Sequence, residues 1–416
     1  MFRIIYILLS FFPAIASAQS ATSFSSSIRS PQMVLNEVWN DPPVMRLGSD
    51  DILTFSFDEM SHTYKRYTYR ITHRNSDWTL SDLVEIDYLD GFNGMPIEEW
   101  ENSVNTTQLY THYTFTVPNE NVALKLSGNY RVEVYDDEFR EDIPVLRYDF
   151  SVVETKVGIG ARISGDTDRS LNDGEQQLSF IVDYSRYSVA SPASDIKPVI
   201  YQNRRRYNAV SGIKPTYITA NRAEYSFNSR LIFDAGNEYR RFELTDPNST
   251  GLNVENVLYD EPNYHALLYM DKVRHTHSNY RDENGMFYVN TLEGYGSPIE
   301  ADYVYVHFAL EAPYRKGGSY YLMGDLCNGD FNRANMLEYD KENGYYHISK
   351  LLKLGVYNYM YAWLPDGASR PMLAFSEGNF YNTENEYMIY IYHRAFGERY
   401  DRLVGVHVVR YSLERN

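Results

Sequence analysis

Apolar and polar residues alternate along most of this chain with a period of two. The alternation is clear in Leu53-Thr-Phe55-Ser-Phe57, in Tyr67-Thr-Tyr69-Arg-Ile71 and in Val304-Tyr-Val306-His-Phe308. Because successive side chains of a strand point to opposite faces, this period predicts strands with one buried face. The same pattern predicts further strands at 113–117, 130–134, 150–152, 178–182, 198–201, 264–269, 320–323, 351–363, 387–392 and 404–413.

Turn-forming pairs such as Asp90-Gly91, Asn93-Gly94 and Ser127-Gly128 separate these runs. Such spacing is typical of antiparallel sandwiches. No stretch has a helical period long enough for a stable helix, although 97–100 could form a turn. Rossmann, P-loop and barrel enzymes need strand-to-helix crossovers, so the pattern argues against them. We therefore expect an all-β protein of tandem immunoglobulin-like β-sandwich domains.

Shifts in composition divide the chain into three predicted domains. The run at 150–152 resembles the last strand of a first domain, and a cluster of Gly, Ser and Pro at 294–298 suggests a later boundary. We predict an N-terminal β-sandwich domain at 24–155, a second β domain at 156–298 and a C-terminal immunoglobulin-like domain at 299–416.

The first 18 residues have the features of a signal peptide. Arg3 is followed by an apolar stretch and by Ala16-Ser17-Ala18, a small-residue cleavage site. No cysteine follows that site to carry a lipid, and no later segment reaches the ~20 apolar residues of a membrane helix. We expect an exported protein that is not inserted in the membrane and has no anchor of its own.

Composition narrows the partners and the role of the abundant tyrosine. The formal net charge is -17, and an acidic surface repels phosphate backbones, which argues against a nucleic-acid partner. The basic run Arg204-Arg205-Arg206 is interpreted as a solvated strand end. The 40 tyrosines are interpreted as core residues whose rings pack and whose hydroxyls stay polar, and the alternative is a surface on which sugars or nucleic acids stack. Cys327, the sole cysteine, excludes an intramolecular disulfide and is expected in the core.

Two polar clusters could in principle bind metal. His275 and His277, with His265 and Asp271 nearby in sequence, have spacing compatible with zinc, but no third ligand stands at a diagnostic interval. The segment 166–173 is rich in Asp, but an EF-hand loop that began at Asp166 would need Gly and Glu where this chain has Leu171 and Gln177. We interpret 166–173 as an acidic hairpin connection and predict no metal site.

No pattern identifies a catalyst. Gly158-Ile-Gly160 is not followed by a helix whose N-terminus could bind phosphate. A strand that passes close to another backbone explains these glycines equally well. The chain contains no Gly-x-Ser-x-Gly elbow. The acidic run 136–138 is typical of a solvated turn. We predict a protein that is not an enzyme and that has no catalytic residues and no cofactor.

The order of short sequence blocks resembles the plug proteins of the type IX secretion system of Bacteroidetes. The first blocks include Ser76-Asp-Trp78, Asn105-Thr-Thr107, Tyr110-Thr-His-Tyr113 and Ser127-Gly-Asn-Tyr130. Others follow at 71–73, 85–93, 117–119, 233–242, 302–306 and 354–359, so the resemblance covers nearly the whole mature chain.

This resemblance implies a mechanical role. Plug proteins of this family close the periplasmic opening of the large outer-membrane β-barrel translocon that exports folded cargo. Wide barrels enclose aqueous channels unless something fills them. A compact chain of this length is roughly 55 Å wide, which suits a stopper. The resemblance therefore implies a periplasmic protein at the inner face of the outer membrane whose partner is the translocon. It does not identify the partner-binding residues, and the acidic segments 136–138 and 166–173 are only candidates.

The third predicted domain also resembles immunoglobulin-like glycogen-binding modules. The similarity lies in 320–325, 336–340, 344–346 and 355–359. Those modules use tryptophans as sugar platforms, but the corresponding stretch 326–331 contains none, and Trp363 is expected in the core. An exported carbohydrate-binding accessory protein is therefore the alternative function, and no small-molecule substrate is expected for a plug.

Overall fold

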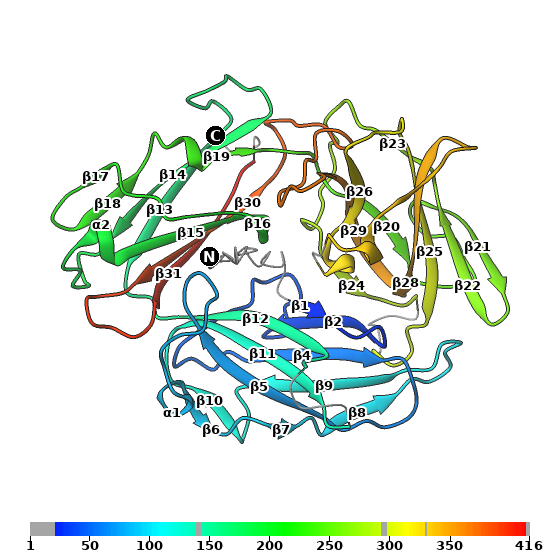
Figure 1. The fold of residues 1–416 in the computed structure, drawn as a ribbon, viewed down its shortest axis with the longest axis horizontal. Coiled ribbons are helices and arrows are strands. Elements are labelled where there is room, and N and C mark those ends of the chain that lie inside the picture. The colour runs from blue at the N-terminus through cyan, green and yellow to red at the C-terminus, as the bar shows by residue number, and fades with distance from the viewer. Residues whose placement is uncertain (1–20, 139–142, 293–297, 329–330, 413–416) are drawn as a thin grey trace, which may run out of the picture.

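The computed structural model describes residues 21–138, 143–292, 298–328 and 331–412. In these ranges both α-helices, α1 (Glu85–Tyr88) and α2 (Pro192–Asp195), are only four residues long. The expected all-β class is confirmed. Three β-sandwiches lie around a common centre (Figure 1). The predicted signal peptide lies outside the described residues. None of the described helices has the length and apolar character needed to cross a bilayer.

Sandwich 1 contains all strands before residue 154. One sheet has the order β1-β12-β11-β5-β7 with β3 beside β12, the facing sheet has the order β2-β4-β9-β8, and β10 pairs with β6. Stacked rings fill the space between them, for example Phe55 on Phe115 at 4.9 Å. The strands are β1 (Ala21–Ser23), β2 (Ile28–Leu35), β3 (Val44–Arg46), β4 (Leu53–Glu59), β5 (Tyr67–Arg74), β6 (Leu89–Gly91), β7 (Met95–Pro96), β8 (Glu99–Asn102), β9 (Thr111–Val117), β10 (Val122–Leu124), β11 (Gly128–Asp136) and β12 (Leu146–Val153).

Sandwich 2 combines two distant parts of the chain. One sheet has the order β13-β14-β18-β17 with β19 beside β14, and the other has the order β16-β15-β30-β31. A short 3-10 helix, η1 (Ser229–Leu231), precedes β19. The strands are β13 (Gly158–Ser164), β14 (Glu175–Asp183), β15 (Ile196–Gln202), β16 (Arg205–Ser211), β17 (Tyr217–Ile218), β18 (Arg222–Tyr225), β19 (Ile232–Asp234), β30 (Glu386–His393) and β31 (Arg402–Arg410).

Sandwich 3 is inserted between those two parts. One sheet has the order β20-β29-β24 with β26 beside β29, and the other has the order β21-β22-β25-β28-β27 with β23 beside β25. Two 3-10 helices follow β26, namely η2 (Asp325–Cys327) and η3 (Arg333–Asn335). The strands are β20 (Arg240–Leu244), β21 (Val254–Asp260), β22 (Asn263–Leu268), β23 (Asp271–Lys272), β24 (Phe287–Val289), β25 (Tyr303–Glu311), β26 (Gly318–Met323), β27 (Glu338–Asp340), β28 (Tyr345–Lys353) and β29 (Gly355–Pro365).

The strand pairing crosses the predicted boundary at 298. Strand β20 lies before this boundary, yet it pairs with β29, and β30 lies after it, yet it pairs with β15. The first boundary, at 155, coincides with the end of sandwich 1. Two local predictions are wrong. The turn suggested at 97–100 is not formed, because strand β8 begins at Glu99, and 351–363 is two strands that meet at Leu354.

Tyrosine is core material, as the first interpretation of its abundance expected. It supplies eleven of the twelve largest fully buried side chains, from Tyr67 to Tyr392. Ten of these eleven hydroxyl groups are bonded inside the protein, and the exception among the described residues is the Tyr225 hydroxyl. Tyr148, for example, donates to the backbone oxygen of Ser56 at 2.6 Å, and Tyr130 donates to that of Leu126 at 2.7 Å. A buried tyrosine can therefore contribute its ring to packing without leaving its polar tip unsatisfied.

Candidate functional site

Strand β30 is buried on both faces because it belongs to two cores at once. Tyr387, Ile389 and Ile391 face the interior of sandwich 2. The alternate residues, among them Met388 and Tyr390, form a second apolar cluster that includes Val153 at the end of sandwich 1. Sandwiches 1 and 2 are thus joined by a continuous apolar layer, which favours one rigid body over two flexibly linked ones.

A buried carboxylate joins sandwich 1 to sandwich 3. Asp58, at the end of β4, accepts hydrogen bonds at 2.6 Å from Lys353 of β28, from Tyr303 of β25 and from His112 of β9. Asp58 and Lys353 are each at most 2 % exposed. The Lys353 ammonium also lies 4.2 Å from the ring centre of Tyr110. Every charge that this junction buries therefore has several polar or aromatic partners.

The two charges at this junction respond differently to their surroundings. Burial tends to raise the pKa of Asp58, but the charge of Lys353 and the hydrogen bond from His112 outweigh burial, so this pKa lies below its usual range. Burial lowers the pKa of Lys353, and Asp58 offsets only part of that effect. The carboxylate and ammonium therefore hold each other in the ionised state, and removing either one would leave a charge buried alone.

A second carboxylate supports the same junction. Asp302, just before β25, accepts hydrogen bonds from the backbone nitrogens of Thr107 at 2.8 Å and Gln108 at 3.1 Å, and from the Thr107 hydroxyl at 2.8 Å. Tyr110 donates to the backbone oxygen of Ala301 at 2.8 Å. The sequence blocks at 105–107, 110–113 and 302–306 therefore meet in space.

Polar anchors also join sandwich 1 to sandwich 2. Asp149 of β12 is bonded to Arg131 at 2.7 Å and to Arg206 of β16, and the Arg206 guanidinium lies 3.7 Å from the ring centre of Trp78. Asp401, before β31, accepts from the Ser76 hydroxyl at 2.7 Å and from Lys197 at 2.6 Å. Ser76 and Trp78, the two ends of the sequence block 76–78, thus both contact sandwich 2.

The interpretation of Arg204, Arg205 and Arg206 as a solvated strand end is wrong. Asn203 and Arg204, both with positive φ, form the two-residue turn between β15 and β16, which points to the centre of the molecule. Arg204 donates to the backbone oxygen of Asn40 in sandwich 1 at 2.5 Å and reaches the Met286 sulfur of sandwich 3. Arg205 donates to the Tyr239 hydroxyl at 2.9 Å, and Arg206 binds Asp149. The three side chains therefore contact all three sandwiches.

Two chain crossings connect sandwich 2 to sandwich 3, and they are bonded to each other. The first crossing runs through 235–239 and the second through 376–385. Phe380 donates its backbone N–H to the Gly236 oxygen at 2.8 Å, and Asn237 donates to the Glu377 oxygen at 2.8 Å. Because two bonded segments span this junction, a simple hinge about a single linker is not available.

A pair of acidic side chains, Glu238 and Asp282, lies beside these crossings. Glu238 accepts from His277 at 3.1 Å and from the backbone of Glu384 at 2.8 Å, and it also reaches Asp282. Burial and the charge of Glu238 raise the pKa of Asp282 to about 7. Burial, with the charge of Glu384, raises the pKa of Glu238 in the same direction. The pair therefore shares a proton under conditions in which ordinary carboxyls are ionised.

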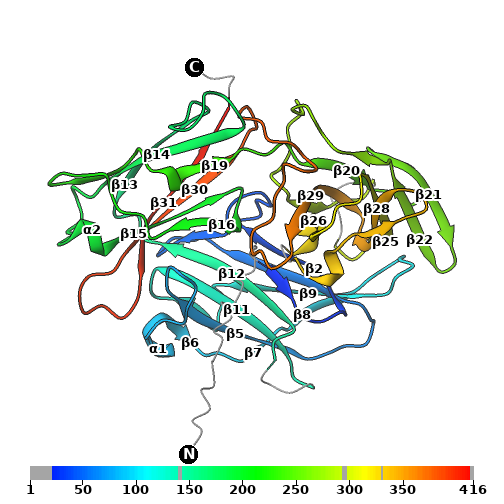
Figure 2. The same cartoon turned by 45° about the horizontal axis from the view of Figure 1, so that its top comes forward.

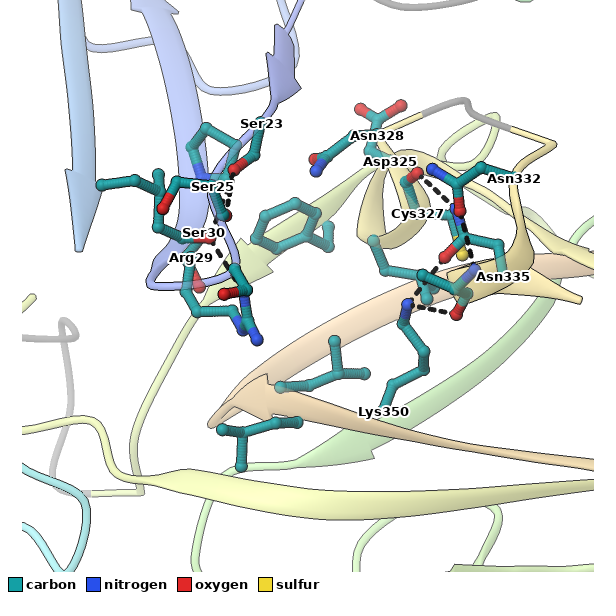
Figure 3. A pocket seen from close by; sticks show the side chains of 18 of the residues that line it. Ser23, Ser25, Arg29, Ser30, Asp325, Cys327, Asn328, Asn332, Asn335 and Lys350 are labelled. Carbon is teal, nitrogen blue, oxygen red and sulfur yellow. Dashed lines mark hydrogen bonds between the residues drawn. The ribbon is translucent and has the colours of Figure 1, made fainter. Parts of the chain in front are cut away.

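A cleft lined by both polar and apolar side chains separates the first strands of sandwich 1 from sandwich 3. It has a volume of about 480 Å³ and is bounded by residues 23–31 on one side and by η2, η3 and β28 on the other. Figure 3 shows Arg29 and Ser30 on the first wall, with Asn335 and Lys350 on the second. Lys350 donates to the Asn335 side chain at 2.6 Å. Hydroxyl, amide and cationic groups together suit a hydroxyl-rich or anionic ligand.

The structure does not bring the histidines weighed as zinc ligands together. His277 bonds to Glu238, whereas His265 bonds to His307 at 2.9 Å, and Asp271 bonds to Arg240 at 2.7 Å. No group of three or more potential metal ligands occurs among the described residues. The segment 166–173 lies in the connection of the antiparallel pair β13–β14, as predicted, and Gln177 of β14 donates to Asp168.

Some of the remaining sequence predictions are confirmed and others are not. Asp136 is buried at the end of β11 and accepts from the backbone of Glu138 at 3.0 Å, whereas Asp137 and Glu138 form an exposed turn, so the prediction of a solvated turn is confirmed only for 137–138. A Cβ added at Gly160 would meet open space, so no close strand crossing explains this glycine. Cys327 and Trp363 are buried in sandwich 3, as expected.

The sequence interpretation missed the junction residues Asp58, Asp149 and Lys353. Only one local signal existed: Lys353 interrupts the apolar run Leu351-Leu352-Lys353-Leu354, where an unpaired charge would be costly. The partners of these residues stand far away in sequence, at separations such as 295 residues for Asp58 and Lys353. No periodicity could have identified them.

Fold and junctions together define a class: a β-sandwich protein whose three units are locked into one block. Comparison with known proteins then identifies the family. Residues 28–154 match the model of the type 9 secretion system plug protein first domain. A crystal structure of a hypothetical protein from Parabacteroides merdae is 38% identical, covers 94% of this chain and 99% of its own, and has a TM-score of 0.92. Among curated proteins, no match was found.

The chain belongs to the type IX secretion system plug protein family. Membership associates it with the type IX secretion system and with the cell envelope. The family is secretion-associated and non-catalytic.

Proposed function

We propose that the protein reversibly blocks the periplasmic opening of the outer-membrane β-barrel translocon of the type IX secretion system, without catalysing a reaction. The match of residues 28–154 to the plug protein first domain carries this proposal. Occlusion requires bulk and stiffness, because a stopper that deforms would leak. A compact chain of this length has a radius of gyration of about 21 Å and is roughly 55 Å wide. Wide barrels enclose aqueous channels unless something fills them.

The junctions support a mechanical role of this kind. Buried ion pairs at Asp58 and Asp149, the apolar layer at β30 and the double crossing resist relative motion of the sandwiches. A rigid body can seat in an aqueous opening and leave it without unfolding. Cargo and plug would then compete for the same opening.

Deletion of the gene in the source bacterium tests the occluding role. The expected result is increased outer-membrane permeability to large antibiotics, reversed by the wild-type chain. A matched test purifies the barrel in detergent and asks whether the plug co-purifies with a cargo-free population. Unchanged permeability together with no co-purification would contradict the proposal.

The cleft between sandwiches 1 and 3 favours a second candidate, binding of carbohydrate by an exported accessory protein. Its hydroxyl and amide lining suits sugar hydroxyls, but residues 325–328 and 331–335 contribute no tryptophan platform to it. A glycan array probed with the mature full chain separates the two functions. Specific binding that is lost in Lys350→Ala and kept in the surface variant Lys272→Ala would favour this second candidate.

A further inference from the structure

One end of sandwich 1 displays large apolar side chains to solvent. Leu80, Val84, Ile86 and Phe92 are between 59% and 76% exposed, although they lie close together in sequence. Phe396, fully exposed in the loop between β30 and β31, is the fifth member. We call these five side chains the apolar tip. Such gathered apolar exposure marks a contact surface more often than scattered single residues do.

The two segments of the apolar tip are fastened to each other. Arg399 pairs with Asp87 at 2.8 Å, Arg394 pairs with Asp82 at 3.5 Å, and the Asp82 backbone donates to the Arg399 oxygen at 3.3 Å. In Figures 1 and 2 the red loop between β30 and β31 lies beside α1. The apolar tip therefore combines side chains from sandwiches 1 and 2.

Local hydrogen bonds hold the apolar tip in an exposed conformation. The Asn93 side chain donates to Glu85 at 2.8 Å and to the Ile71 oxygen at 3.0 Å, and it accepts from the Ile71 nitrogen at 2.7 Å. Lys125 donates to the Ile86 oxygen. Phe92 and Ile86 are consequently held away from the core by bonded neighbours, so their exposure belongs to the folded state.

The surroundings of the apolar tip are strongly acidic. Residues 75–124 contain nine Asp or Glu and no Lys or Arg. Two of the nine, Asp82 and Asp87, pair with Arg394 and Arg399, and the other seven have no ion pair among the described residues. Four of those seven lie on α1, β6 and β8, along the lower edge of Figure 1. All seven are exposed: Asp77, Glu85, Asp90, Glu98, Glu99, Glu101 and Glu120.

We propose that the apolar tip and its acidic surroundings dock onto a basic protein surface with an apolar centre, presented by the barrel translocon at its periplasmic opening. The inference rests on the proposed plug function and identifies the surface that would serve it. The negative charge around the apolar tip indicates which partner binds there. A second copy of this chain would bring like charges together, and anionic lipid headgroups would be repelled, whereas a cationic rim would be attracted and steered into place.

Charge reversal tests the docking surface in the full mature chain. The variant Asp90→Lys, Glu98→Lys, Glu99→Lys changes three exposed carboxylates of the acidic stretch 75–124, one in β6, one at the start of β8 and one just before β8. The matched control, Glu255→Lys, Asp260→Lys, Glu261→Lys, makes the same charge change on the exposed β21–β22 hairpin of sandwich 3. Binding of each to the purified barrel in detergent is measured by biolayer interferometry at two salt concentrations, and thermal unfolding confirms that both variants are folded.

We expect the tip variant to lose about tenfold or more in affinity, mainly through a slower association rate, and the control to stay near wild type. Phe396→Ser should weaken binding at both salt concentrations, because its contribution is apolar. Equal affinities for both charge variants, whether both normal or both weakened, would overturn this assignment while the plug function stands. Absence of wild-type binding to the barrel would instead contradict the proposed function itself.

Discussion

The junction of Asp58 with Lys353 shows how one buried pair can determine the relation of two sandwiches. Exposed ion pairs contribute little, because water already solvates both charges. A buried pair is different: removal of one partner leaves the other without solvent or counter-charge. The same reasoning applies to Asp149, which faces Arg131 and Arg206.

Lys353→Met should therefore destabilise the protein by about 3–5 kcal/mol, because Asp58 would remain buried without its counter-charge. The free energy of unfolding in denaturant measures the effect. The control is Lys272→Met, which removes the exposed pair with Glu311 and should cost less than about 1 kcal/mol. Equal losses for both variants would contradict this role of Lys353.

The carboxyl pair Glu238 and Asp282 predicts a pH dependence. A carboxyl in the unfolded chain titrates near pH 4, whereas burial and the charge of Glu238 raise the pKa of Asp282 to about 7 in the folded protein. Between these values the folded state binds a proton that the unfolded state has lost. The stabilising contribution is therefore complete below about pH 4 and decreases as the pH rises to about 7 and beyond.

Glu238→Gln should reduce this dependence, because it removes the charge of Glu238 and one of the two titrating carboxyls, whereas the burial of Asp282 remains. The measured quantity is the unfolding free energy of the variant minus that of wild type. We expect this difference to be larger at pH 8 than at pH 5. Glu255→Gln, at an exposed site on β21, should show no such change. A constant difference between Glu238→Gln and wild type at both pH values would refute the shared proton. His277, Arg274, Arg205 and Glu384 also face the pair.

At the scale of elements, the alternating pattern located the strands but not their partners. Strands β4, β5, β9 and β25 lie where the period of two predicts them. Strand β30 also lies where it was expected, yet all eight of its residues are buried. Its second face is covered by sandwich 1, so its near-continuous apolar sequence reflects a junction between sandwiches.

The pairing of the strands predicts which fragments fold. The fragment 20–155 contains every strand of sandwich 1 and should fold alone. The fragment 299–416 lacks β20 and β24, two of the three partners of β29, and contains β30 and β31 without β15. We expect it to remain unfolded or aggregate. Circular dichroism and thermal unfolding of both fragments, with 156–416 as a control that restores the missing strands, measure this. A cooperative transition in 299–416 would be contrary to the pairing described.

At the scale of the whole molecule, the three sandwiches form one block because every pair of them shares buried contacts. The turn at Arg204 lies where all three meet, and sandwiches 2 and 3 are joined by two crossings. A chain of this kind resists bending more than three domains on single linkers would.

Small-angle X-ray scattering of the mature protein should accordingly give a radius of gyration of about 21 Å, the value for a compact chain of this length. The double variant Lys353→Met, Arg206→Met removes one anchor at each junction of sandwich 1 and should increase the radius. The double variant Lys272→Met, Arg222→Met, at exposed ion pairs, is the control. A larger radius in the wild type would show that the units move independently.

Much of the architecture was accessible from the chain alone. Its period of two, its turn pairs and the scarcity of helical periodicity determined an all-β fold, and the order of its sequence blocks pointed to the plug family, because these are local properties of neighbouring residues. The interleaving of sandwiches 2 and 3, the burial of the three arginines and the pairing of Asp58 with Lys353 were decided by the tertiary structure. They depend on contacts between residues far apart in sequence, and such contacts leave no regular local signal for a single sequence to display.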